Sequence, residues 1–302
     1  MPLTCNESYF KESEAISQEV VFAHKRKKSY IWEKYMKIFT FLGDGMRTIA
    51  ILNQKGGTGK TTTAVNLAAS LAEAGKSVLL IDMDPQASAS MWYGFKDKGR
   101  ALFEVLTDER GIQESLEKTS MKGLDILPAS QLLAGVEKAL AQEVGAERVL
   151  KCKFDELKEK PWDYVLIDCP PTLGILSLNA LSMVKEVLVP VETHVMALHG
   201  LVQLLKTIDL VQQRVNPGLI LSGILACRVD FRTKHSSEVL GQLKNRFEGK
   251  VFTSVIRENV RLAEAPLHIK PIISYDPNCN GSNDYRSLAK ELMSQDKSAL
   301  AS

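Results

Sequence analysis

The chain has 302 residues, of which 45% are hydrophobic and 25% are charged, and its formal net charge is +2. This length and apolar content suit one large α/β domain or two small ones, and the near-neutral balance excludes an argument for nucleic-acid binding from net charge alone. The five cysteines include no C-x-x-C pair, so the sequence indicates neither a disulfide framework nor a zinc site. The longest apolar runs are far short of a membrane span, and we expect no signal peptide.

Residues 1–45 are mixed in character and show no clear period. Their basic run at 25–28 is more often a solvated patch than a binding site. Met46 lies directly before the first predicted strand. We expect residues 1–45 to be an N-terminal extension, partly helical or disordered, or the product of a wrongly chosen upstream start codon. We expect residues 46–302 to form a single domain.

From residue 46 onward, short apolar runs alternate with stretches of helical period. This alternation is typical of a parallel sheet with crossover helices. We therefore predict the α/β class, with a doubly wound, mostly parallel β-sheet flanked by helices. The predicted strands are 49–52, 77–81, 124–127, 164–167, 187–189, 219–226, a short one near 251, and 271–274. The predicted helices are 60–74, 131–142, 146–159, 174–184, 197–214, 236–247, 260–264 and 283–294, with short helices and loops over 87–120.

The first predicted strand runs into a glycine-rich loop at 55–61, Lys-Gly-Gly-Thr-Gly-Lys-Thr. Glycines let such a loop turn its N–H groups inward, and the helix N-terminus adds partial positive charge, so the loop forms a cradle for a di- or triphosphate. There Lys60 would lie on the β- and γ-phosphates and the Thr61 hydroxyl on Mg²⁺. The loop departs from G-x-x-x-x-G-K-[ST] because Gln54 stands at its first glycine, and a second lysine, Lys55, stands at its head.

Two later strands end in acidic residues at the same edge of the predicted sheet. Asp168 follows the apolar strand 164–167, which is the position of a Walker B carboxylate that holds Mg²⁺ through water. The prolines after it and the hinge at Gly174 suit a loop that distinguishes ATP from ADP. Asp82 and Asp84 follow the strand 77–81, and the alternation of side chains along a strand puts both on one face.

The ordered set of motifs resembles the ParA/MinD family of ATPases, whose members carry a deviant Walker A motif with an extra lysine. It looks like the ParA/Soj branch, which partitions chromosomes and plasmids, rather than MinD. The resemblance covers roughly residues 46–294 and is far more specific than the glycine-rich loop alone. It rests on the segments 55–61, 81–86, 127–130 with 133–135, 166–171, 201–207, 259–266, 270–272 and 275–277.

The resemblance implies an ATPase that uses ATP and Mg²⁺, weak alone and stimulated by a partner. It implies that Lys55 crosses a dimer interface to the partner's nucleotide, that Asp84 orients the attacking water, and that Asp82 supports the magnesium shell. The predicted catalytic residues are Lys55, Lys60 and Asp84, and the predicted metal-site residues are Thr61, Asp82 and Asp168. The predicted nucleotide-binding residues are Lys55, Gly56, Gly57, Thr58, Gly59, Lys60, Thr61, Thr62, Arg257 and Asn259.

Members of this branch bind DNA without sequence preference when they are dimeric, and arginines of the C-terminal half form the surface. By position these are Arg232 and Arg261, and phosphate contacts from such residues give salt-sensitive, sequence-independent affinity. This sequence departs from its relatives at 256–259, where Ile-Arg-Glu-Asn replaces Ile-Pro-Arg-Asn. Arg257 therefore carries over only by position, and Glu258 thins the positive surface, as does the uncharged segment 278–280.

The partners implied by the resemblance are a second copy of the chain in an ATP-dependent homodimer, non-specific double-stranded DNA and a ParB-like centromere-binding protein. The implied location is cytoplasmic and nucleoid-associated, without stable membrane association.

Three alternatives remain open. One is a ParA-like ATPase that positions a protein cargo. Another is a MinD-like membrane-associated switch, which needs a basic amphipathic C-terminal helix, whereas the tail 295–302 is short and weakly charged. The third resembles the nitrogenase iron protein, whose cluster needs two suitably placed cysteines, whereas only Cys169 lies in the expected switch loop.

Overall fold

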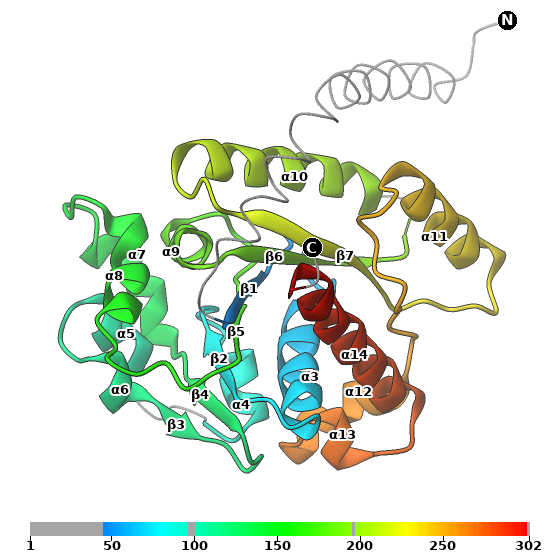
Figure 1. Ribbon diagram of the computed structural model, residues 1–302, viewed down its shortest axis with the longest axis horizontal. Helices are drawn as coiled ribbons and strands as arrows, with labels where there is room; N and C mark the ends of the chain where they lie inside the picture. Colours follow the sequence, from blue (N-terminus) through cyan, green and yellow to red (C-terminus); the bar gives the residue numbers. More distant parts are fainter. Residues whose placement is uncertain (1–44, 96–100, 195–196, 301–302) are drawn as a thin grey trace, which may run out of the picture. The chain divides into compact units, whose positions relative to one another are not determined.

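The computed structural model describes residues 45–95, 101–194 and 197–300 (Figure 1). Within these ranges, Met46–Gln295 form one compact unit. The expected N-terminal extension lies almost wholly outside the described residues. The compact unit contains all of the predicted site residues.

The compact unit is built on a seven-stranded sheet with the order β3-β4-β2-β5-β1-β6-β7. All neighbouring strands in this sheet are parallel except β3 and β4, which form an antiparallel pair at one edge. This confirms the predicted doubly wound, mostly parallel sheet. The strands are β1 (Arg47–Ile51), β2 (Val78–Asp82), β3 (Glu117–Lys118), β4 (Leu124–Leu127), β5 (Tyr164–Asp168), β6 (Glu186–Glu192) and β7 (Ile220–Cys227).

The central strands are apolar along their whole length because helices cover both faces of the sheet. In β1, Ile49 and Ile51 face one buried cluster, whereas Ala50 and the following Leu52 face the other. This is the two-residue period of a strand with two buried faces. The first cluster lies against α3 (Lys60–Glu73), α4 (Ser88–Trp92), α13 (Ile272–Tyr275) and α14 (Asn280–Leu300) (Figure 1). The second lies against α5 (Ala101–Leu106), α7 (Val136–Ala139), α8 (Val149–Asp155), α9 (Ile175–Met183) and α10 (Ala197–Arg214).

The helices from α3 to α10 lie between strands in the chain, and the later ones follow β7. Three of the shorter described helices are 3-10 turns, labelled η. No helix in the ranges that the structure describes is both long and apolar enough to cross a membrane. The helical elements are α3 (Lys60–Glu73), α4 (Ser88–Trp92), α5 (Ala101–Leu106), α6 (Ile112–Ser115), η1 (Gln131–Gly135), α7 (Val136–Ala139), η2 (Ala146–Arg148), α8 (Val149–Asp155), α9 (Ile175–Met183), α10 (Ala197–Arg214), α11 (Lys234–Arg246), α12 (Val260–Glu264), η3 (Ala265–His268), α13 (Ile272–Tyr275) and α14 (Asn280–Leu300).

The segment 271–274 was predicted as a strand, and that prediction is wrong. It lies in the short helix α13, whose N-cap is Pro271. The first helical N–H, that of Ile272, donates to the Oδ1 atom of Asn66 on α3 at 2.7 Å. Proline is tolerated at a helix start because the N–H that it lacks would have no partner within the helix there. A short apolar run has no readable period, so the sequence could not distinguish a strand from a helix. Packing against α3 therefore decides the conformation.

Candidate functional site

The loop between β1 and α3 has the conformation that its glycines permit. Gly57 and Gly59 have φ angles of 76° and 87°, in the left-handed region that favours glycine. A Cβ built on Gly57 would meet no atom within 4 Å, so backbone conformation rather than space requires glycine there. Gly59 is the N-cap of α3, and no described side chain caps it. The first N–H groups of α3 are therefore available to an anion.

The two lysines of this loop have opposite environments. Lys60 is buried, and its Nζ donates to the backbone oxygen of Lys55 at 3.2 Å. Burial lowers the pKa of Lys60, and the charges of Asp168 and Asp84 oppose that shift. The side chain of Lys55 is 47% exposed, and its Nζ lies 3.5 Å from Glu192 at the end of β6. The Lys60 side chain therefore points into the loop, whereas the Lys55 side chain points outward to solvent.

The backbone of the loop is fixed to β6 by Asn53, which sequence reasoning missed. The buried Asn53 accepts a hydrogen bond from the Lys55 N–H at 3.0 Å and donates to the Pro190 carbonyl at 2.7 Å. The Thr58 hydroxyl closes the turn by donating to the Lys55 oxygen at 3.3 Å. An asparagine directly after a buried apolar run is the signal that could have indicated this role. A buried amide needs a donor for its oxygen and an acceptor for its NH₂ group.

Asp168 is a buried carboxylate whose oxygens lack a well-formed hydrogen bond within the described part of the chain. It ends β5 in register with Asp82 of β2, and both residues are fully buried. No described group forms a hydrogen bond of good geometry with either oxygen of Asp168. Burial, and then the charge of Asp82, raise its pKa well above the usual range, while the Thr61 hydroxyl and Lys60 act in the opposite direction. A carboxylate left this way beside a threonine hydroxyl fits a divalent cation, which prefers oxygen ligands.

Asp82 differs from Asp168 because protein donors already satisfy it. Its Oδ2 accepts from the N–H and the hydroxyl of Ser90 at 2.8 and 2.7 Å, and its Oδ1 accepts from the N–H of Asp84 at 3.2 Å. Burial raises the pKa of Asp82 to about 6, against these hydrogen bonds. Asp82 thus holds the loop that presents Asp84. Ser90 was missed, since a serine in a short helix has no distinctive pattern.

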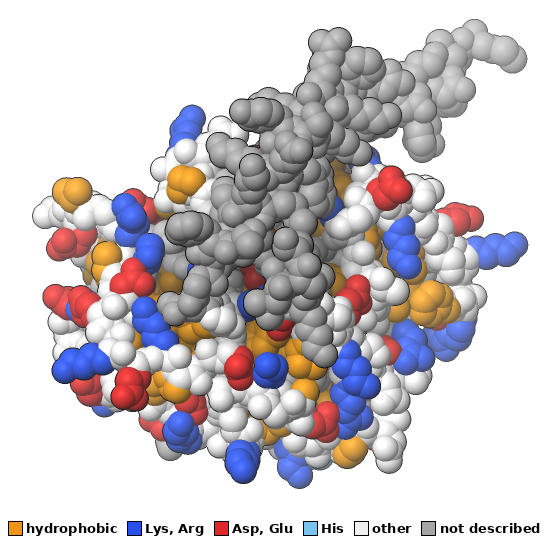
Figure 2. All heavy atoms as spheres, in the orientation of Figure 1, with side chains coloured by type: hydrophobic (Ala, Val, Ile, Leu, Met, Phe, Trp, Pro, Cys, Tyr) orange, Lys and Arg blue, Asp and Glu red, His pale blue; other side chains and the backbone are white. Residues whose placement is uncertain are grey.

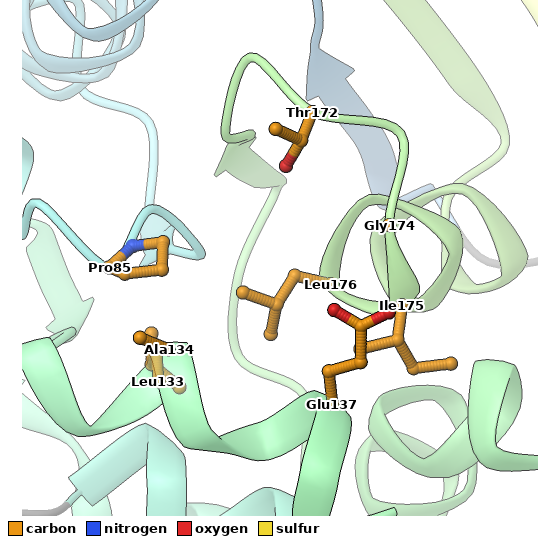
Figure 3. Close-up of a pocket in the computed structure, with 8 residues that line it drawn as sticks. All are labelled: Pro85, Leu133, Ala134, Glu137, Thr172, Gly174, Ile175 and Leu176. Atoms are coloured by element: carbon orange, nitrogen blue, oxygen red, sulfur yellow. The ribbon is translucent and has the colours of Figure 1, made fainter. Parts of the chain in front are cut away.

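A pocket of about 160 Å³ separates the loop after β2 from the loop after β5 (Figure 3). Pro85 directly follows Asp84 on the first loop, and Thr172 and Gly174 belong to the predicted switch on the second. Glu137 of α7 and Ile175 of α9 line the same pocket. The loop after β2 and the loop after β5 therefore both line this pocket. The lining residues are Pro85, Leu133, Ala134, Glu137, Thr172, Gly174, Ile175 and Leu176.

The predicted base-binding residues lie on a segment that pairs with the end of β7. Val229 and Arg257 form a parallel bridge, and a Cβ on Gly59 would lie 3.8 Å from Cys227. The backbone N–H and the Nε atom of Arg257 both donate to Asp284 of α14, at 2.9 and 3.0 Å. Asn259 caps α12 by accepting from the Arg261 N–H at 2.8 Å. Both side chains thus have structural partners here.

The two predicted DNA-contacting arginines lie outside the phosphate cradle, Arg232 on the turn before α11 and Arg261 in the short helix α12. Arg232 is 86% exposed and pairs with Asp230 at 2.8 Å. Arg261 is 54% exposed and pairs with Glu264 at 2.8 Å and with Asp276 at 3.5 Å. On the face shown in Figure 2, basic and acidic side chains are interspersed. Local acids therefore already neutralise these arginines.

The structure thus brings Lys55, Lys60, Thr61, Asp82, Asp84 and Asp168 to one edge of the sheet. A glycine-rich loop between a strand and a helix, a buried lysine at the helix start and an unpartnered carboxylate on the adjacent strand define a P-loop nucleoside triphosphatase.

Comparison with known proteins narrows this class. Residues 46–221 match the model of an AAA domain family. The sporulation initiation inhibitor protein Soj of Bacillus subtilis is 44% identical over 248 residues, which are 82% of this chain and 98% of that protein. The structure of cobyrinic acid a,c-diamide synthase from Mycobacterium smegmatis, with bound ADP and magnesium, aligns with a TM-score of 0.73 at 36% identity, over 84% of this chain and 96% of that chain. The cell division ATPase MinD of Pyrococcus furiosus aligns with a TM-score of 0.69 at 27% identity, over 82% and 99%.

The chain belongs to the ParA/Soj branch of the ParA/MinD family of P-loop ATPases. The predicted fold class, ATPase activity and cofactors ATP and Mg²⁺ are thereby confirmed.

Proposed function

We propose that this ATPase partitions DNA. Its ATP-bound dimer binds double-stranded DNA without sequence preference in the cytoplasm, on the nucleoid, and leaves it after hydrolysis stimulated by a ParB-like partner. The relatives named for chromosome partitioning support the process, as in the ParA protein of Myxococcus xanthus, 44% identical over 252 residues. The observation that supports the dimer is the outward side chain of Lys55, which is 47% exposed while Lys60 occupies its own loop.

We assign the hydrolytic roles from the geometry at the sheet edge. Thr61 and Asp168 would hold the magnesium ion, directly or through water, and Asp82 would support them by fixing the loop of Asp84. Magnesium, when bound, neutralises charge on the β- and γ-phosphate oxygens. Lys60 adds a buried positive charge on the same phosphates, and Gly56, Gly57, Thr58, Gly59 and Thr62 complete the cradle. The half-buried Asp84 orients the attacking water.

Arg257 and Asn259 are proposed to border the base, because their segment lies against the end of β7 next to Gly59. Arg232 and Arg261 are proposed to contact DNA phosphates. Each must exchange a local acid for a phosphate, so each contact adds little affinity and is sensitive to salt. Two copies of the surface in a dimer multiply these weak contacts, which makes DNA binding depend on nucleotide.

The test is the binding of random-sequence duplex DNA with ATP, with ADP and without nucleotide, across a series of salt concentrations. We expect tight binding with ATP only, and a steep loss of affinity as salt rises. Equal binding with ATP and ADP at low salt would contradict the proposed function.

A further inference from the structure

A chain of ion pairs leads away from the outward lysine of the nucleotide loop. Lys55 Nζ lies 3.5 Å from Glu192 Oε2, and the other oxygen of Glu192 lies 3.0 Å from Arg228 Nη1. The second nitrogen of Arg228, Nη2, lies 3.6 Å from Glu258 Oε1. Glu192 thus shares its two oxygens between two cations. The path joins the nucleotide loop to the segment that also contains Arg257 and Asn259.

Glu192 and Arg228 are held by backbone contacts rather than placed on free loops. Glu192 ends β6 and is in register with Cys227 of β7. Arg228 follows with a φ of 52°, a left-handed conformation that is uncommon for a side chain of this size. The Arg228 carbonyl accepts from the Thr193 hydroxyl at 3.3 Å, which ties this turn back to the end of β6. Strain of this kind persists where the surroundings impose it, often at functional sites.

We propose that Glu192 is a positioning residue that tethers Lys55 in the resting subunit, and that Arg228 weakens the tether by sharing Glu192. This rests on the proposed dimer, in which Lys55 must leave its own subunit for the partner's nucleotide. When Lys55 leaves, Glu192 keeps Arg228 and is not left without a cation. The release therefore avoids the cost of a half-buried carboxylate with no partner.

The expected size of the effect follows from the exposure of the pair. The Lys55 and Glu192 side chains are 47% and 23% exposed, so solvent screens their attraction. Pairs of this kind change an equilibrium by about two- to fivefold, and less at high salt. The tether thus sets a threshold for dimerisation and does not block it.

Two variants have opposite expected effects. Glu192→Gln keeps the size and polarity of the side chain but removes the charge, so Lys55 is released. Arg228→Met removes the competing cation, so Lys55 is held more tightly. The matched control is Glu156→Gln, which breaks another lysine–glutamate pair at 3.5 Å, with Lys153, at the C-terminal end of helix α8.

The experiment measures dimerisation of the full chain with the non-hydrolysable nucleotide AMPPNP by sedimentation velocity, with thermal unfolding as the check of the fold. We expect Glu192→Gln to lower the dimer dissociation constant about two- to fivefold and Arg228→Met to raise it by a similar factor. We expect Glu156→Gln to leave it unchanged. Both effects should shrink in high salt.

A second readout follows the tether itself. Acetylation of Lys55 in the nucleotide-free protein, measured by mass spectrometry, should be faster in Glu192→Gln and slower in Arg228→Met. If the wild type dimerises but neither variant changes the dissociation constant, or both change it in the same direction, the tether is overturned and the proposed function stands. If the wild type fails to dimerise with AMPPNP, the proposed function fails and the tether loses its role.

Discussion

Two regions of the molecule hold their charged side chains in opposite states: the edge of the sheet at β1, β2 and β5, and the exposed surface formed by the turns and short helices of residues 228–276. At the sheet edge, Asp168 is buried with no hydrogen bond of good geometry from any residue that the structure describes, and Lys60 is desolvated. On this exposed surface, Arg232 and Arg261 are open to solvent and already paired with local acids. The first region holds unfavourable electrostatic free energy that a ligand relieves, whereas the second must exchange existing partners. We therefore expect strong nucleotide dependence at the sheet edge and weak, additive DNA contacts on the exposed surface.

The largest expected effect tests the sheet edge. Asp84→Ala removes the group that is proposed to orient the attacking water, so the rate of ATP hydrolysis should fall by about 10²- to 10⁴-fold. Nucleotide binding should survive, because Lys60 and the loop are untouched. The measurement is phosphate release at saturating ATP, together with retention on DNA. Hydrolysis at the wild-type rate would show that another group orients the water.

Asp168→Asn tests whether the buried carboxylate at the sheet edge lowers the stability of the nucleotide-free protein. Removing an unpartnered buried charge should raise the free energy of unfolding of the nucleotide-free protein at pH 7 by an amount on the order of 1–3 kcal/mol, while hydrolysis is lost. Urea unfolding in EDTA measures this. The exposed Asp155→Asn is the control, since its carboxylate pairs with Lys151 in solvent and its loss should bring no gain.

The same variant has an expected pH dependence. Burial raises the folded-state pKa of both Asp168 and Asp82, the latter to about 6, from an ordinary value of 3.8. Between 3.8 and the folded pKa, the unfolded chain has lost protons that the folded chain still holds, so wild-type stability falls as pH rises. The advantage of Asp168→Asn should thus be absent below about pH 4 and grow toward neutral pH. An advantage that is constant with pH would contradict this origin.

Arg261→Glu tests the second region. Reversing one exposed charge per subunit should weaken ATP-dependent DNA binding by about tenfold at low salt and reduce the salt slope, while ATP binding is unchanged. Fluorescence anisotropy with a labelled duplex measures both. Glu264→Gln, which frees Arg261 from its 2.8 Å partner, should strengthen binding slightly. Unchanged DNA binding in Arg261→Glu would remove this residue from the DNA surface.

The smallest effect concerns backbone strain in the exposed region. Ile269 is 53% exposed and has a φ of 54°, a conformation that is an outlier for a β-branched residue. Ile269→Gly should relieve this strain and raise the free energy of unfolding by about 0.5–1 kcal/mol, after the entropy cost of glycine. The neighbouring Leu267→Gly, which has no such strain to relieve, should lower it. A loss of stability in Ile269→Gly would mean that its side-chain contacts outweigh the strain.

The sequence predicted the structure correctly where neighbouring residues alone determine the type of element. The buried parallel strands are continuous apolar runs, so β4 was predicted with its observed bounds, Leu124–Leu127. The glycine-rich loop and the acids at strand ends could be placed together because parallel strands end at one edge. The α13 segment failed because Pro-Ile-Ile-Ser has no readable period, and packing against Asn66 decides it. The predicted helix 131–142 is instead divided into η1 and α7 at Gly135.

The partners of individual side chains could not be predicted from the sequence. Arg257 was expected near the base, and it folds onto Asp284, which lies 27 residues further along the chain. Ser90 and Asn53 satisfy or anchor the site through contacts that only the assembled sheet creates. Hydrogen-bond partners distant in sequence depend on tertiary packing, whereas strand and loop type depend mainly on neighbouring residues.

The central claim is that the loop 55–61 serves two nucleotides, its own through Lys60 and the partner's through Lys55. The direct measurement is AMPPNP binding and sedimentation of Lys60→Ala and Lys55→Ala side by side. We predict that Lys60→Ala lowers nucleotide affinity by about tenfold to a hundredfold, because a charge-assisted contact is lost. We predict that Lys55→Ala binds nucleotide as a monomer nearly as the wild type does, yet no longer dimerises. Normal dimerisation of Lys55→Ala would contradict the account.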